Sequence, residues 1–261
     1  MYQEVFNRLM KIMRPFMKEQ GFASKGNNFY KRHPQGNIGI INFQRNKERF
    51  PKFTINIGIY SIVLAKFFLA EFNQKQIKEY PPLGDYHWQT RIGNLVPKQN
   101  AYRQKDKKWL NGDDKWWHYD DRIDVEAMFR EISELIAEFA IPVIDKHITD
   151  GKLKEYWFEA AESSKKDAEI EVGELHAGIE RVKAQIFRKL LILLLASREK
   201  EKFKMMMSEF NEYLQHHPEY TGLKRDYDRL KKEMDENYRL DSNSNRKFEN
   251  EDDTSPKKMK P

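Results

Sequence analysis

The sequence predicts an α+β protein with an antiparallel sheet of four to five strands flanked by helices, followed by a helical C-terminal region. Three observations support this prediction. Residues 37–61 hold two runs rich in β-branched residues around a polar turn, which is typical of paired strands. Amphipathic helical patterns lie before and after them, at residues 2–20 and 125–146. Beyond residue 149 the apolar spacing is helical.

The N-terminal part of the chain leads into a β-hairpin. Apolar residues three and four apart predict the first helix, kinked or broken at Pro15 and ended by Gly21. Residues 27–31 predict a short first strand. The hairpin follows at 37–61, where strand alternation directs one set of bulky apolar residues to the core. The opposite face then carries Asn42, Gln44, Asn56 and Tyr60.

The segment after the hairpin alternates between helical and strand patterns. Residues 62–72 predict a short helix. Residues 86–94 predict a fourth strand, with Tyr86, Trp88, Thr90 and Ile92 on one face and His87, Gln89 and Arg91 on the other. Residues 98–114 are lysine-rich and predict a loop, and residues 115–119 a short edge strand.

The second half of the chain is predicted to be helical. Asp121 or Asp124 caps the helix predicted from residue 125, which bends at Pro142 and is ended by Asp150–Gly151. We predict an α+β domain at 1–148, a helical hairpin or bundle at 149–240, and a disordered tail at 241–261, which is almost devoid of apolar residues. The alternative is that the C-terminal helices pack over the sheet's second face and complete a single domain.

Composition narrows the classes of function. The 47 basic and 41 acidic residues nearly cancel, so the net charge of +6 does not indicate a dedicated nucleic-acid binder. The chain has no cysteine, which excludes disulfides, thiolate zinc sites and cysteine nucleophiles. Its longest apolar run, residues 190–196, is far shorter than the ~20 residues of a membrane span. We therefore expect a cytoplasmic protein without membrane contact.

The polar face of the predicted sheet is the main candidate for binding. Its amides and guanidinium can hydrogen-bond a peptide strand, a carboxylate or a phosphate. The simpler alternative is the solvated face of an antiparallel sheet. Binding would depend most on Asn56 and Arg91, unless Asn56 satisfies a buried group and Arg91 pairs with a nearby acid. The candidate binding residues are Asn42, Gln44, Asn56, Tyr60, His87, Gln89, Arg91, Trp116 and Trp117.

Catalysis and metal binding have weaker support. His87 and His118 each lie two positions from an aspartate, but no nucleophile motif accompanies them, so an enzyme is not favoured. We expect no cofactor and no metal site, because the histidines lack the spacing of known sites. Trp116 and Trp117 lie among lysines, which also fits a nucleic-acid platform. Adjacent strand residues face opposite ways, so we expect one of the two in the core.

Several short segments occur in an order that is similar to one known family. They are Gly21–Phe22, Gly26–Tyr30 (GNNFY), Ile41–Gln44 (INFQ), Phe53–Tyr60 (FTINIGIY), His87–Leu95 (HWQTRIGNL) and Asp114–Trp117 (DKWW). Over residues 1–145 the chain resembles domain-of-unknown-function family 4304 (DUF4304). The resemblance implies a bacterial cytosolic α+β domain without an assigned activity, and some such domains are suspected of immunity-like roles near toxin genes.

These observations lead to two hypotheses about function. The first is a non-enzymatic module that binds a protein partner, with an immunity-like role as one form of it. The alternative is nucleic-acid binding through the lysine- and tryptophan-rich residues 98–117. The sequence predicts neither the identity of the partner nor the oligomeric state.

Overall fold

The computed structural model describes residues 2–46, 51–71, 76–112, 114–120, 122–164, 179–216, 218 and 220–249. The chain divides into two compact units, Met1–Leu193 and Leu194–Pro261, which are described separately below. The domain boundaries expected at residues 148 and 240 stay predictions.

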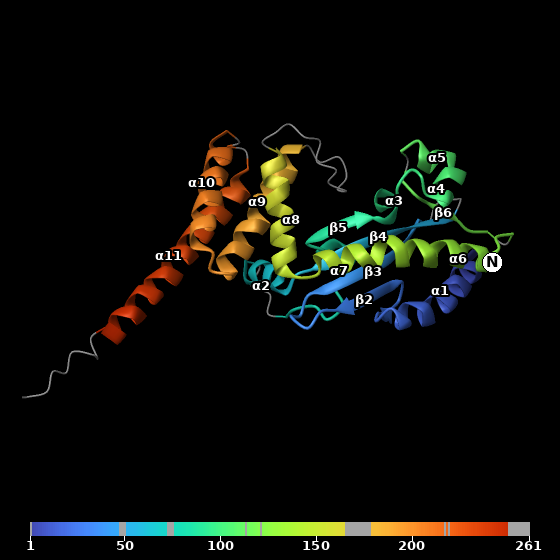
Figure 1. Cartoon of the computed structure of the whole chain (residues 1–261), viewed down its shortest axis with the longest axis horizontal. Helices are drawn as coiled ribbons and strands as arrows, with labels where there is room; N and C mark the ends of the chain where they lie inside the picture. The colour runs from blue at the N-terminus through green and yellow to red at the C-terminus, as the bar shows by residue number, and fades with distance from the viewer. Residues whose placement is uncertain are drawn as a thin grey trace, which may run out of the picture. The chain divides into compact units, whose positions relative to one another are not determined.

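The first unit is built on an antiparallel sheet that has six strands within the described residues (Figure 1). β4 is the central strand: β3 pairs with one of its edges, and β5 and β6 pair with the other. The α+β class is confirmed, and the predicted first strand is β2. β1 was not predicted. The strands are β1 (Ala23–Lys25), β2 (Asn28–Arg32), β3 (Ile38–Asn46), β4 (Lys52–Tyr60), β5 (Trp88–Arg91) and β6 (Trp117–His118).

The β3–β4 hairpin has the predicted alternation. Ile41 lies opposite Ile57 and Phe43 opposite Ile55, and all four are buried on what we call the first face of the sheet. Asn42 lies opposite Asn56 on the second face. The predicted pairing of the two strands is therefore confirmed, together with the division of their residues between the two faces. Residues 47–50, which hold most of the predicted turn, lie outside the described residues.

Helices that precede and follow the hairpin in the sequence cover the first face. Phe6 of α1 (Tyr2–Glu19) packs edge-on against Phe53 with ring centroids 5.5 Å apart. α1 continues through Pro15 without a break. The second cover consists of α6 (Val125–Leu135), the π-helical η2 (Ile136–Ala140) and α7 (Ile141–His147). Ile144 of α7 lies directly over Gly39, where a Cβ would come within 2.3 Å of its Cγ2.

Capping side chains account for one error in the prediction. Residues 98–114 were expected to form a loop, but they contain α4 (Ala101–Lys105) and α5 (Lys107–Leu110). The side chain of Asn100 accepts a hydrogen bond from the Tyr102 amide, and that of Asp106 accepts one from the Trp109 amide. These caps stabilise helices that are too short to show an apolar period.

The predicted strand at 86–94 is also shorter than expected. Residues 83–85 form the 3₁₀ helix η1 (Leu83–Asp85), and α3 (Ile92–Leu95) follows β5 at once. Tyr86 precedes the strand, so the alternation of strand side chains between the two faces does not determine where its ring points. Its ring lies over Gly58 on the second face rather than beside Trp88 on the first, which corrects the predicted arrangement.

The later part of the chain is helical, as predicted. α2 (Ile62–Glu71) matches the helix expected after the hairpin, and Asp124 caps α6. The predicted helix end at 150–151 is wrong, because α8 (Asp150–Ser164) begins there. α9 (Ile179–Ala196) lies in the region predicted as a helical hairpin or bundle, and residues 165–178 lie outside the described residues.

The second unit contains α10 (Lys200–His216) and α11 (Thr221–Glu249). They pack on each other through apolar stripes, with the rings of Phe210 and Tyr227 6.1 Å apart and Leu230 fully buried. α11 extends into the predicted tail as far as Glu249, and residues 250–261 lie outside the described residues.

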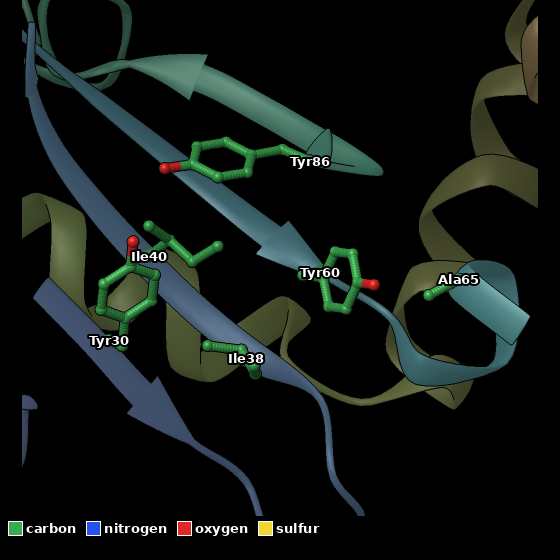
Figure 2. Packing of buried hydrophobic residues seen from close by; sticks show 6 residues of the cluster. All are labelled: Tyr30, Ile38, Ile40, Tyr60, Ala65 and Tyr86. Carbon is green, nitrogen blue, oxygen red and sulfur yellow. The ribbon is translucent and has the colours of Figure 1, made fainter. Parts of the chain in front are cut away.

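An apolar cluster covers one part of the second face (Figure 2). It combines side chains of β2, β3 and β4 with Ala65 of α2 and with Tyr86, which precedes β5. The rest of this face, toward Asn46 and Lys52, where β3 ends and β4 begins, carries polar residues instead. The buried members of the cluster are Tyr30, Ile38, Ile40, Tyr60, Ala65 and Tyr86.

The contact between Gly58 and Tyr86 predicts that Gly58→Ala destabilises the fold. A Cβ at this position would lie 2.0 Å from Cδ2 of the packed Tyr86 ring. We expect a loss of about 1–3 kcal/mol in the free energy of unfolding, the usual cost of overpacking. Urea unfolding measures it. Gly84→Ala is the control, since nothing lies within 4 Å of its added methyl group. Equal stability of the two variants would contradict the prediction.

Candidate functional site

A chain of side-chain amides crosses the polar part of the second face. Asn28, Asn42 and Asn56 stand directly opposite one another on β2, β3 and β4. Asn42 Nδ2 donates to Asn28 Oδ1 over 2.6 Å. Asn56 Nδ2 donates to Asn42 Oδ1 over 3.1 Å and to Gln44 Oε1 over 2.8 Å. We call these four residues the amide ladder.

The amide ladder is buried at one residue and accessible at the others. Asn56 is only 6% exposed, whereas Asn28, Asn42 and Gln44 are half-buried. Each side-chain amide has two N–H donors and an oxygen that accepts two hydrogen bonds. The bonds within the ladder use part of this capacity, so its half-buried members can still bind a polar group from outside.

Arg91 continues the row on β5, where it lies opposite Asn56. Its guanidinium pairs with the carboxylate of Asp114 and lies 5.6 Å from the ring centre of Trp116. Burial outweighs the nearby Arg91 charge and raises the pKa of Asp114. Lys52 Nζ lies 5.0 Å from the same ring. Both Asn56 and Arg91 therefore have partners within the protein, which fits the structural alternative for them.

Tyr60 and His87 lie on the same face but in the apolar part. Their rings stack with centroids 5.0 Å apart. Nδ1 of His87 accepts a 2.9 Å hydrogen bond from the backbone N–H of Ser61. Burial, with a smaller effect from Lys189, lowers the pKa of His87 to about 3, so the ring is neutral at pH 7. Gln89 is half-buried between the two parts of the face, opposite Gly58.

The two adjacent tryptophans separate as expected. Trp117 is buried on the first face, stacked on Phe53 at 5.5 Å, with Nε1 donating to Glu131 over 3.0 Å. Trp116 points to the second face and is half-buried. The structure thus gathers Asn42, Gln44, Asn56, Arg91 and Trp116, with Gln89 at the margin, and separates Tyr60, His87 and Trp117 from them.

A pocket of about 790 Å³ adjoins Trp116, and we call it the lysine pocket. Its buried cation is Lys115, whose Nζ lies 3.2 Å from Asp106 and 3.1 Å from Glu131. A third tryptophan of this region, Trp109, is fully buried and donates from Nε1 to the Gly93 carbonyl. The pocket is lined by Lys52, Tyr102, Lys105, Asp106, Lys107, Lys108, Asp114, Lys115, Trp116, His118 and Glu131.

Sequence reasoning missed two parts of this arrangement. Asn28 belongs to the amide ladder, but only the register between β2 and β3 places it opposite Asn42. Asp114 was assigned to a loop, although it is the partner of Arg91. The sequence segments NNFY and DKWW could have indicated Asn28 and Asp114, since each segment places a polar residue at or next to a predicted strand.

A buried polar network fixes the other end of the hairpin. Asn37 Nδ2 donates to the Ile148 carbonyl and to Asp150 Oδ1, over 3.0 and 2.9 Å. Ser61 Oγ donates to the same Asp150 oxygen over 2.6 Å. Asn37 Oδ1 accepts from the Ile62 amide, which is the start of α2. The network joins β3, α2 and α8, and its groups are occupied with one another. Among the described residues, no group of three or more His, Asp or Glu could hold a metal ion.

The amide ladder predicts that Asn56→Thr is destabilising. Threonine has a single O–H donor and cannot serve both oxygens that now accept from Asn56 Nδ2, so at least one of Asn42 and Gln44 loses its donor. We expect a cost of about 1–3 kcal/mol in the free energy of unfolding. Chemical denaturation followed by far-UV circular dichroism measures it. A change within the ±0.5 kcal/mol typical of surface positions would contradict the structural role.

The buried His87 predicts a loss of stability in acid. Its folded pKa of about 3 lies below the ordinary value of 6.5, so the unfolded chain binds the proton first. The stabilisation is complete above pH 6.5 and is lost as the pH falls toward 3, by up to about 1.4 kcal/mol per pH unit. Burial lowers the pKa of His147 to about 4, which acts in the same direction.

His87→Gln isolates this contribution, because glutamine can still accept from Ser61 but does not titrate. Urea unfolding between pH 7.5 and 5 should show a smaller pH dependence for the variant than for the wild type. An NMR titration of the His87 ring with a midpoint near 6.5 would contradict the burial argument.

Comparison with known proteins adds one finding about the family. The sequence model of the family described as "Domain of unknown function (DUF4304)" matches residues 13–146, half of the chain. No curated protein and no solved structure matches the chain significantly. Within the described residues, every helix is too short or too polar to cross a membrane. The family match covers the whole sheet, the amide ladder and the lysine pocket, and the chain belongs to the DUF4304 family.

Proposed function

We propose that the protein is a non-enzymatic binding module that holds a protein partner on the polar part of its second sheet face. The observation that carries this proposal is the amide ladder, whose Asn28, Asn42 and Gln44 remain half-buried with unused hydrogen-bonding capacity. These groups lie on a rigid sheet, so binding a partner costs little conformational entropy for ordering them.

The surroundings of the ladder suit a protein interface. Trp116 is a half-buried aromatic residue beside the ladder, and Lys52 and Arg91 lie against its ring. Tryptophan and arginine are enriched among the residues that carry most of the energy of protein interfaces. The partner would contact Asn42, Gln44 and Trp116, while Asn56 and Arg91 hold these groups in position.

The family membership does not assign a partner. An immunity-like role, in which the partner is a toxin, remains one form of this proposal. A location in the cytoplasm belongs to it as well, and the cysteine-free sequence is compatible with that reducing compartment.

Nucleic-acid binding through residues 98–117 remains the second candidate, and the lysine pocket is the observation that favours it. Two of the three tryptophans in that region, Trp109 and Trp117, are buried and unavailable for base stacking. Single-strand platforms stack successive bases on aromatic rings. The protein-binding proposal is therefore the stronger of the two.

The proposal predicts that Gln44→Glu weakens partner binding without unfolding the protein. Glutamate keeps the oxygen that accepts from Asn56 but replaces the outer amide donors with negative charge. We expect at least a tenfold loss of the partner recovered stoichiometrically from native lysate, quantified by mass spectrometry.

Gln35→Glu is the matched control, since it makes the same change at an exposed turn residue away from the ladder. Recovery of the same partner at equal yield with the wild type and with both variants would refute the proposed surface. Absence of any stoichiometric partner would refute the function itself.

A further inference from the structure

The lysine pocket is built on the short helices α4 and α5, which the core holds in place. Trp109 of α5 is buried to 1% exposure, and its indole N–H donates to the Gly93 carbonyl over 3.1 Å. Asp106 accepts the Trp109 amide at 3.2 Å and pairs with Lys115 at the same distance. Burial opposes the charge of Asp106, but these hydrogen bonds outweigh it and lower its pKa. The backbone that carries the neighbouring lysines is therefore preorganised.

The charges of the pocket do not cancel. Five lysines and three carboxylates line it. The carboxylates are already engaged: Asp106 and Glu131 with Lys115, and Asp114 with Arg91. Among the described residues, none of Lys105, Lys107 and Lys108 forms an ion pair with a carboxylate, and all three are exposed. One wall of the pocket thus presents uncompensated positive charge.

We propose that the lysine pocket binds a small phosphorylated ligand. Lys105, Lys107 and Lys108 hold the phosphate, and the rest of the molecule lies against Trp116. A phosphate monoester carries nearly two negative charges at pH 7 and three acceptor oxygens, which suits a group of lysine ammoniums better than a single carboxylate does. The pocket volume of about 790 Å³ falls within the ~300–1,000 Å³ of small-molecule sites.

The aromatic residues favour a small ligand over a nucleic-acid strand. Of the three tryptophans in residues 98–117, Trp109 and Trp117 are buried, and Trp116 alone lines the pocket. Binding a strand relies on several stacked bases and on a groove that follows the backbone. A ligand of the size of one nucleotide makes full use of one ring and one cluster of lysines.

Isothermal titration calorimetry on the full chain at low salt tests the proposal. The probes are inorganic phosphate, adenosine 5′-monophosphate and adenosine. The double variant Lys107→Gln/Lys108→Gln removes two charges from the pocket, and Lys11→Gln/Lys18→Gln removes two from exposed positions on α1 that do not line it. We expect the monophosphate to bind the wild type and the α1 variant equally, and the pocket variant at least tenfold more weakly.

Adenosine should bind at least tenfold more weakly than its monophosphate, and the monophosphate should shift the NMR signal of the Trp116 indole N–H. No binding of either phosphate probe at millimolar concentration, or equal affinity for the two double variants, would overturn the proposal. Affinity for oligothymidylate that grows with its length would also overturn it, and would assign the surface to single strands. The partner-binding test stays independent, because Gln44 does not line the pocket.

Discussion

The register between β3 and β4 is the constraint on which both faces of the sheet depend. It places Ile41 against Ile57 and Phe43 against Ile55 on the first face, and Asn42 against Asn56 on the second. Full burial of one such apolar side chain contributes about 1.5–3 kcal/mol, against about 0.5–1.5 kcal/mol for a hydrogen bond. A slip by one residue would exchange the faces. The apolar face therefore sets the register, and the amide ladder follows from it.

Gly58 divides the second face into its apolar and polar parts. The Tyr86 ring occupies the space that a side chain at this position would fill, and this brings the apolar cluster as far as the middle of β4. Two residues nearer to Lys52, where β4 begins, Asn56 starts the polar part. Tyr86 comes from the segment before β5. The boundary therefore depends on a residue outside the hairpin.

The sequence predicts the features that depend on neighbouring residues and misses those that depend on contacts between distant segments. Strand alternation within the hairpin is local, so the sides taken by Ile57 and Asn56 were predictable. The position of Tyr86 depends on where β5 begins. The alternating pattern of residues 86–94 does not show that the strand starts only at Trp88. β1 is exposed throughout and leaves no apolar pattern. The burial of His87 and the pairing of Arg91 with Asp114 arise from segments 26 and 23 residues apart, which a linear pattern does not encode.

The pair of Arg91 and Asp114 shows how stability and positioning are divided in this site. Burial raises the pKa of Asp114 even with a guanidinium beside it, so desolvation outweighs the attraction, and half-buried ion pairs of this kind add little net stability. β5 is held instead by its backbone pairing with β4 and by the burial of Trp88. The pair with Asp114 holds the Arg91 guanidinium next to the Trp116 ring, at the point where the amide ladder meets the lysine pocket. Apolar contacts thus supply the fold, and the polar pairs orient the surface that is left open.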